Sequence, residues 1–122
     1  MISYVTVGTN DLPRATAFFD TLLAEMGASR MMNMDRMVIY GTQAGAPMLS
    51  VCKPYDGKPA TAGNGTMVAL NAGSREAADK VYRKALELGG ADEGAPGERG
   101  PGIYGGYFRD LDGNKFFACV LG

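Results

Sequence analysis

The chain contains an internal repeat, and this repeat restricts its fold more than any other feature. An apolar, strand-like segment followed by an amphipathic helix begins at Tyr4 and occurs again, without a gap, 63 residues later at Met67. A second match, at an offset of 67 residues, places 49–52 on 116–119. Self-similarity of this kind predicts two modules that fold in the same order.

Each copy is predicted to form one strand, one helix and three further strands. Asp11 and Ser74 stand where helix N-caps are expected, and Gly27 and Gly89 follow the apolar stripes of the two helices. The second copy closes with a hairpin whose Asp-Gly-Asn turn favours positive φ. The expected strands are 2–8, 29–33, 36–40, 47–52, 66–71, a short one within 91–99, 103–109 and 115–121.

This order predicts an α+β fold with two βαβββ modules. They should form a pseudo-two-fold pair of curved mixed sheets, each backed by one helix, whose free concave faces can meet. We expect one domain over 1–122, with module one at 1–52, a connector rich in Pro and Gly at 53–64, and module two at 65–122. A single ferredoxin-like sheet is the competing fold, but it has no place for a third strand after each helix.

Charge and composition exclude several classes of partner. The net charge is −1 with both signs mixed along the chain, so we expect no binding to nucleic acid or to an anionic membrane. No apolar run approaches the roughly 20 residues of a membrane span, and the first residues lack a signal peptide's pattern. We therefore expect a cytoplasmic protein with two reduced cysteines. The chain contains no histidine, the usual general base and transition-metal ligand.

Three segments carry a resemblance to a known family. They are the opening ISYVTVGTNDLPRATAFFDTLLAEMG, the middle KPYDGKPATAGNGTMVAL and the closing YFRDLDGNKFFACV, which is similar to an R-D-P-D-G-N ending with Leu111 in place of Pro. Together they resemble the vicinal oxygen chelate superfamily, which includes glyoxalase I, bleomycin resistance proteins and extradiol dioxygenases. The resemblance implies the paired-module fold and a homodimer, but the superfamily spans isomerases, lyases, dioxygenases and drug-binding proteins.

The resemblance also implies where a metal would bind. In metal-using members the first and last strands of each module supply the ligands, and the repeat maps these positions onto Tyr4, Ser50, Met67 and Phe117. Divalent ions prefer imidazole, carboxylate or carbonyl donors, which a phenol, a hydroxyl, a thioether and a phenyl ring do not replace. Shifting the register by one residue brings no better ligand. We therefore expect no metal and no cofactor.

Strand alternation places these four positions on one concave side with other mostly apolar residues. Further pocket candidates are Met48, Cys52, Asn71 and Cys119 on that side, and Arg99, Tyr104 and Tyr107 in the second module. One interpretation is an ordinary core that fills the space of a metal. The other is a pocket for a small organic molecule, with a few hydroxyl, amide and thiol groups in an apolar lining.

Two other motifs resemble functional sites but also have simple structural interpretations. Asp110, Asp112 and Asn114 mimic the start of a calcium loop, but Leu121 stands where the bidentate Glu is required, so a hairpin turn is expected. The glycine-rich segment 94–106 is interpreted as a mobile segment at the pocket mouth, with Arg99 as a contact for an anionic ligand, or as a flexible surface loop.

Cys52 and Cys119 occupy equivalent points of the repeat. We expect both to be buried, unreactive thiols, because no histidine is present to lower their pKa. The alternative interpretation is a nucleophile or a redox pair, with Lys53 or an arginine as the activating charge.

Three hypotheses of function follow. The favoured one is a metal-independent protein that binds a small organic molecule, for sequestration or detoxification. The second is a lyase, isomerase or dioxygenase of the same superfamily, either using a metal through other ligands or working through tyrosine or cysteine. The third is a structural or regulatory dimerisation module. Pairing of the modules within one chain and pairing across a homodimer are both compatible with the connector.

Overall fold

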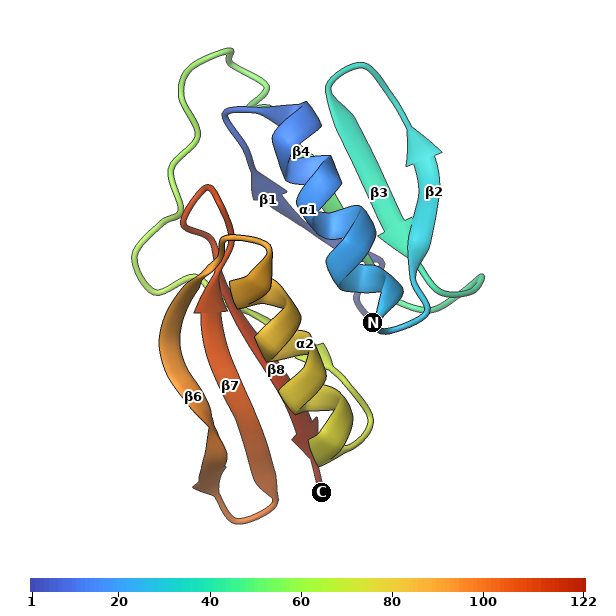
Figure 1. The fold of residues 1–122 in the computed structure, drawn as a ribbon. Helices are drawn as coiled ribbons and strands as arrows, with labels where there is room; N and C mark the ends of the chain where they lie inside the picture. Colours follow the sequence, from blue (N-terminus) through green and yellow to red (C-terminus); the bar gives the residue numbers. More distant parts are fainter.

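The computed structural model describes all 122 residues and contains the same order of elements twice (Figure 1). The first module consists of β1 (Tyr4–Gly8), α1 (Leu12–Ala24), β2 (Ser29–Asn33), β3 (Met37–Gly41) and β4 (Met48–Cys52). The second consists of β5 (Val68–Asn71), α2 (Arg75–Glu87), β6 (Ala91–Gly100), β7 (Ile103–Arg109) and β8 (Lys115–Leu121). The predicted α+β fold with two βαβββ modules is confirmed. Neither helix is long and apolar enough to cross a membrane.

The two sheets have the same topology. Their strand orders are β1-β4-β3-β2 and β5-β8-β7-β6, and in each the first strand of the module pairs in parallel with the last. Thr6 lies opposite Ser50 in the first sheet, and Ala69 lies opposite Phe117 in the second. These pairs are equivalent under the two offsets found in the sequence, so the repeat extends to the register of the strands.

The helices begin and end where the local sequence predicts. The Asp11 carboxylate accepts a hydrogen bond from the Arg14 backbone N–H at 3.1 Å, and the Ser74 hydroxyl accepts one from the Ala77 N–H at 3.1 Å. After α1 the chain turns at Gly27, whose φ of 74° favours a residue without a Cβ. Side-chain capping of this kind satisfies backbone donors that have no partner inside the helix.

Strand β6 corrects one prediction. The segment 94–106, expected as a mobile loop, instead forms part of β6, a two-residue turn and the start of β7. The pairing contains three register shifts, and a Cβ on Gly106 would lie 3.0 Å from the Pro96 ring. The small residues of β7 thus leave room for an irregular strand that contains a proline, as bulged edge strands tolerate.

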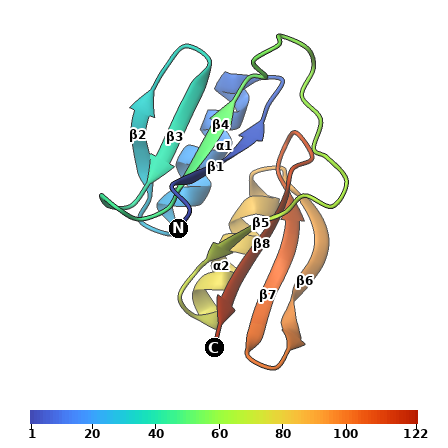
Figure 2. The same cartoon turned by 180° about the vertical axis from the view of Figure 1, so that it is seen from behind.

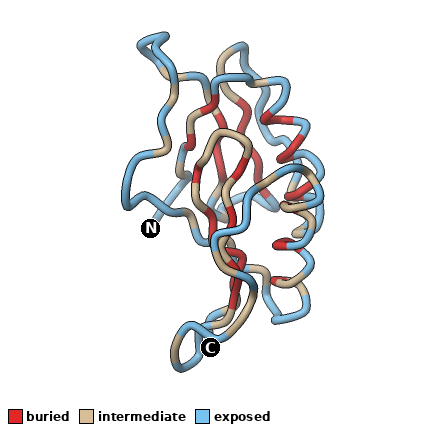
Figure 3. The backbone as a smooth tube through the Cα atoms, turned by 60° about the vertical axis from the view of Figure 1, so that its left-hand side comes forward, coloured by how far each residue is buried: buried red, intermediate tan, exposed pale blue.

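Both helices lie side by side on one face of the molecule, and both sheets lie behind them (Figures 1 and 2). The buried segments concentrate between helices and sheets (Figure 3). Residues of both modules form one hydrophobic cluster, in which the rings of Phe19 on α1 and Phe116 on β8 are 5.6 Å apart. Within the chain the concave faces do not meet, because both turn to the side away from the helices. We call them the first and second open faces.

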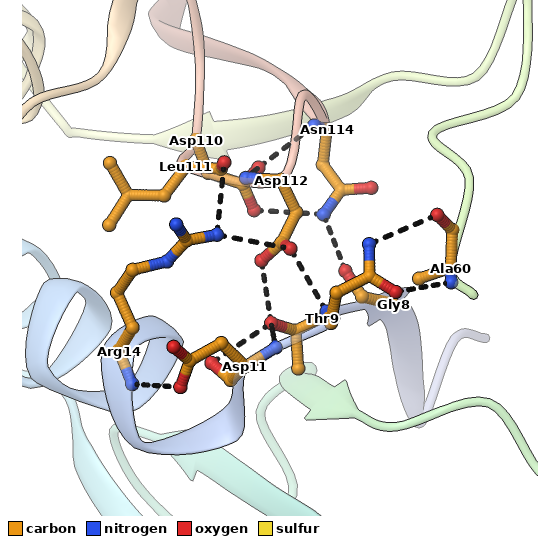
Figure 4. Close-up of polar contacts among 10 residues, drawn as sticks. Gly8, Thr9, Asp11, Arg14, Ala60, Asp110, Leu111, Asp112 and Asn114 are labelled. Carbon is orange, nitrogen blue, oxygen red and sulfur yellow. Dashed lines mark hydrogen bonds and ion pairs between the residues drawn. The ribbon is translucent and has the colours of Figure 1, made fainter. Parts of the chain in front are cut away.

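A polar network joins the end of β1 to the β7–β8 turn (Figure 4). The Asp112 side chain is 3% exposed and accepts hydrogen bonds from the Thr9 hydroxyl at 2.6 Å and the Asn10 backbone N–H at 3.0 Å. Its carboxylate also lies 3.5 Å from the Arg14 guanidinium. In the same turn, the Asn114 amide donates to the Gly8 carbonyl at 2.9 Å. The Asp-x-Asp-Gly-Asn segment is therefore a turn, as predicted, and it also connects the modules.

The Asp110 carboxylate organises this turn from within. It accepts hydrogen bonds from the backbone N–H groups of Asp112 and Asn114 at 2.9 and 2.8 Å, and from the Asn114 side chain at 2.8 Å. Burial raises the pKa of Asp110, and the hydrogen bonds oppose that effect. The turn that presents Asp112 is thus held by a second, buried acid.

We expect Asp112→Ala to lower the free energy of unfolding by about 1–3 kcal/mol, because it leaves the Thr9 hydroxyl without its carboxylate acceptor and removes charge-assisted bonds between the modules. Urea unfolding measures this change. Asp35→Ala is the control, since Asp35 is exposed and forms no side-chain hydrogen bond or ion pair. Equal stability of the two variants would contradict the role given to Asp112.

Candidate functional site

The first open face is apolar and rich in methionine. Val5, Val7, Leu49 and Val51 face the helices in the hydrophobic cluster. Because strand residues alternate in direction, their neighbours face the other way. The face comprises Tyr4, Thr6, Met31, Met32, Met37, Ile39, Met48, Ser50 and Cys52, none of which is charged. It is therefore a neutral surface of thioether, phenol, hydroxyl and thiol groups.

The second open face is aromatic and cationic. The Tyr107 and Phe117 rings stack with centroids 4.4 Å apart and planes 16° apart. The Arg99 guanidinium and the Lys115 ammonium lie 5.1 and 5.0 Å from the Tyr107 centroid. The face comprises Met67, Ala69, Asn71, Arg99, Gly105, Tyr107, Lys115, Phe117 and Cys119, together with Arg109, which lies opposite Lys115 and is paired with Glu93. The two modules share a backbone plan, but their open faces differ in chemistry.

The four positions that the resemblance assigns to metal ligands lie on these faces, Tyr4 and Ser50 on the first and Met67 and Phe117 on the second. No group of three or more His, Cys, Asp or Glu side chains is placed to hold a metal ion anywhere in the chain. A phenol, a hydroxyl, a thioether and a phenyl ring do not fit a hard or borderline divalent ion. The side chains at these four positions therefore do not match the metal ligands of the superfamily that the sequence resembles.

Ser50, on the first open face, has a buried hydroxyl without a hydrogen-bond partner. It is 0% exposed, and its Oγ is the one buried side-chain N or O atom without a hydrogen-bond partner. Its cross-strand neighbours are Thr6 and Ile39. An unsatisfied buried hydroxyl costs about 1–3 kcal/mol, and native proteins contain few such groups.

A groove of about 660 Å³ opens at the seam between the modules, where β5 approaches the starts of β1 and β4. Thirteen of its 17 lining residues are hydrophobic. It brings together Met48, Met67 and Asn71, three of the residues predicted to line a pocket, with Val5, Leu23 and Met26. A mostly apolar concavity with one amide group suits a small organic ligand.

Tyr104 does not lie with the other residues predicted to line a pocket. It lies on the helix side of β7, one residue from Gly105, and its hydroxyl donates to the Asp79 carboxylate at 2.7 Å. The Arg75 guanidinium lies 4.7 Å from its ring centroid. The hydrogen bond to Asp79 raises the pKa of Tyr104. Strand alternation directs its hydroxyl to α2, so it does not contribute to the second open face.

Lys115 is a residue of the site that the sequence reasoning missed. It lies two positions before Phe117 on β8, so strand alternation alone assigns it to the same face. Two polar clefts, of about 580 and 560 Å³, were also missed; they lie beside the start of α1 and share Asn10, Asp35 and Lys53. No periodicity marks them, because they combine a helix start, a turn and the connector.

The two cysteines are free and lie on different sheets. Cys119 is 2% exposed, and burial raises the pKa of its thiol. Cys52 is half-buried and lies opposite Met37. A thiol with a raised pKa is mostly protonated at neutral pH and is a poor nucleophile.

Solved structures of similar chains share this architecture. A crystal structure of a glyoxalase/bleomycin resistance protein from Albidiferax ferrireducens T118 is 35% identical, with a TM-score of 0.88, over 99% of this chain and 97% of that one. A hypothetical protein from S. aureus is 25% identical (TM-score 0.73; 98% and 92% covered). A lactoylglutathione lyase from Agrobacterium tumefaciens is 19% identical and shares the fold (TM-score 0.69; 96% and 90% covered). A comparison with curated proteins gives no significant match.

The fold and the open faces define a protein of paired βαβββ modules. The family model of the Glyoxalase/Bleomycin resistance protein/Dioxygenase superfamily matches residues 1–117. The chain belongs to this superfamily, and the resemblance inferred from the three sequence segments is confirmed.

We expect the two thiols to react at different rates with iodoacetamide at about pH 8, close to the ordinary thiol pKa. Cys52 should be alkylated first, whereas Cys119 should react only when the protein unfolds, because its pKa is raised and its sulfur is buried. Peptide mass spectrometry follows both sites in one sample, and urea-unfolded protein is the control. Faster alkylation of Cys119 in the folded protein would contradict this order.

Proposed function

We propose that the protein binds a small organic molecule without a metal ion, for sequestration or detoxification. The observation that carries this proposal is the chemistry of the four positions where metal-using relatives hold their ion. Tyr4, Ser50, Met67 and Phe117 offer packing surface and two hydroxyls, and Met67 also lines an apolar groove of about 660 Å³. These groups recognise an organic ligand by shape and by few polar contacts.

Methionine supports this function in a specific way. Met48 contributes to the groove and Met31 lies beside it, with both side chains converging over Gly41, where a Cβ would lie 3.0 and 3.1 Å from their Cγ atoms. Thioether side chains are flexible and polarizable, so they adapt to irregular ligands and contact aromatic rings favourably. A surface of this kind suits binding of several related compounds better than one exact substrate.

We further propose that the protein is a homodimer of the cytoplasm. Tyr4, Met31, Met32 and Met67 are 42–50% exposed on the open faces, an unusual concentration of large apolar side chains on a monomer surface. A two-fold arrangement that places the first open face of one copy over the second open face of its partner would cover them, with thioethers against the Tyr107 and Phe117 rings. The two free cysteines fit a reducing compartment.

The first experiment is native mass spectrometry of protein purified without added metal, followed by elemental analysis of the same sample. We expect either a co-purified organic mass or the bare protein, with no stoichiometric divalent ion, because no cluster of carboxylate, imidazole or thiol donors is placed to hold one. One divalent ion per chain that survives dialysis against a chelator would overturn the proposal. The protein would then be assayed as a metalloenzyme.

The dimer is tested by analytical ultracentrifugation of Met31→Lys/Met32→Lys. Burying two ammonium groups against a face that already carries Arg99 and Lys115 should raise the dimer Kd by about 100-fold or more. Ala17→Lys/Thr21→Lys is the matched control, since it adds the same charge to the exposed side of α1. The proposal fails if the wild-type chain is monomeric at micromolar concentration, or if both variants dimerise as the wild type does.

A further inference from the structure

Two positive charges converge on one aromatic ring of the second open face. Arg99 on β6 and Lys115 on β8 approach Tyr107 on β7, the strand between them, to 5.1 and 5.0 Å from its ring centroid. Phe117 stacks on the same ring with a centroid separation of 4.4 Å. The cations thus border an aromatic platform that contains one of the four superfamily metal positions.

Neither cation has a carboxylate partner. No acidic oxygen lies within 4.0 Å of Arg99 or Lys115, and the one acceptor that Arg99 binds is the Ala95 backbone carbonyl. The acids of β6 are all paired with other groups, namely Asp92 with the Tyr82 hydroxyl at 2.7 Å, Glu93 with Arg109, the cross-strand neighbour of Lys115, at 2.8 Å and Glu98 with Arg75 at 2.7 Å. The protein therefore places acids beside this platform and pairs each of them with another group.

The first open face supplies no compensating charge. All of its residues are neutral, so covering the second open face with a partner's first open face would leave Arg99 and Lys115 without a carboxylate. Two like charges close to one ring repel each other, and partial burial by a partner would strengthen this repulsion because it lowers the local dielectric. A bound anion would relieve it.

Space for such a ligand exists at the edge of the platform. Gly97 on β6 carries no side chain, and a Cβ there would meet no atom within 4 Å. The Gly105 position opposite it on β7 is covered by the Phe117 ring, since a Cβ on Gly105 would lie 2.7 Å from Cε1 of that ring. An apolar group could therefore pack over Gly97, beside the Phe117 ring.

We propose that Arg99 and Lys115 form an anion subsite of the ligand site, and that the ligand is a small organic acid. Its carboxylate, phosphate or phosphonate would bind the two cations through charge-assisted hydrogen bonds, while its apolar part packs on Phe117 and toward the seam groove. This inference rests on the proposed function and adds the charge of the ligand to it. An unpaired guanidinium and ammonium at one site select against cationic compounds by the same electrostatics.

The test compares phenylphosphonate with benzyl alcohol, which has the same ring and no charge, by isothermal titration calorimetry on the full chain. The variant is Arg99→Gln/Lys115→Gln. Its control is Lys80→Gln/Arg83→Gln, which removes two exposed charges from α2 that form no ion pair. We expect the first variant to raise the phenylphosphonate Kd at least about tenfold and the control to change it less than about twofold, with weaker binding at high salt.

Thermal unfolding of both variants verifies that they remain folded. Arg99→Gln/Lys115→Gln should also keep the weak affinity of the wild type for benzyl alcohol, because that compound carries no charge. Equal binding of phenylphosphonate and benzyl alcohol by the wild type, or an unchanged Kd in Arg99→Gln/Lys115→Gln, would overturn the anion subsite and leave the proposed function standing. Absence of binding by either compound, together with a ligand-free native mass, would overturn both.

Discussion

The relation between the two modules depends on one buried carboxylate. Asp112 sits at the tip of the β7–β8 turn and accepts hydrogen bonds from the segment that follows β1, more than 100 residues away in the chain. The shared core on the helix side, where Phe19 meets Phe116, is apolar and does not by itself define one orientation. The directional hydrogen bonds to Asp112 define that orientation. They therefore also set how the two open faces lie beside each other.

The two modules keep one backbone plan and divide the chemistry of the site between them. The register that pairs Thr6 with Ser50 pairs Ala69 with Phe117, so equivalent positions carry a hydroxyl in one module and a ring in the other. The first module supplies neutral, adaptable thioethers, and the second supplies rigid aromatic rings and charge. In the proposed homodimer with crossed faces, each site would receive both halves, so a repeat without the superfamily's metal ligands would still form a selective binding site.

Local signals predicted the fold because each acts over a few residues. Asp11, Ser74 and Gly27 capped the helices as expected, and strand alternation assigned Tyr4, Ser50 and Phe117 to the open faces. The same alternation turns Tyr104 to Asp79, away from the face that carries Tyr107. Two features lay beyond such signals. They are the irregular strand β6, whose Pro96 ring packs where Gly106 of β7 has no side chain, and the contact of Asp112 with Thr9. Each depends on a neighbour distant in sequence, which periodicity and composition do not report.

Gly105 has a consequence for how this site can change. A Cβ there would come closest to the Ala118 carbonyl oxygen of the β8 backbone and would lie 2.7 Å from Cε1 of Phe117, so any other residue would force both the strand and the ring to move. The stacked Tyr107 ring and the cations above it would have to move as well. The packing of these rings on the sheet thus depends on position 105 having no side chain. For the proposed ligand site, a change of preference would therefore fall on the methionine face and the rim, where side chains can be exchanged without moving strand β8.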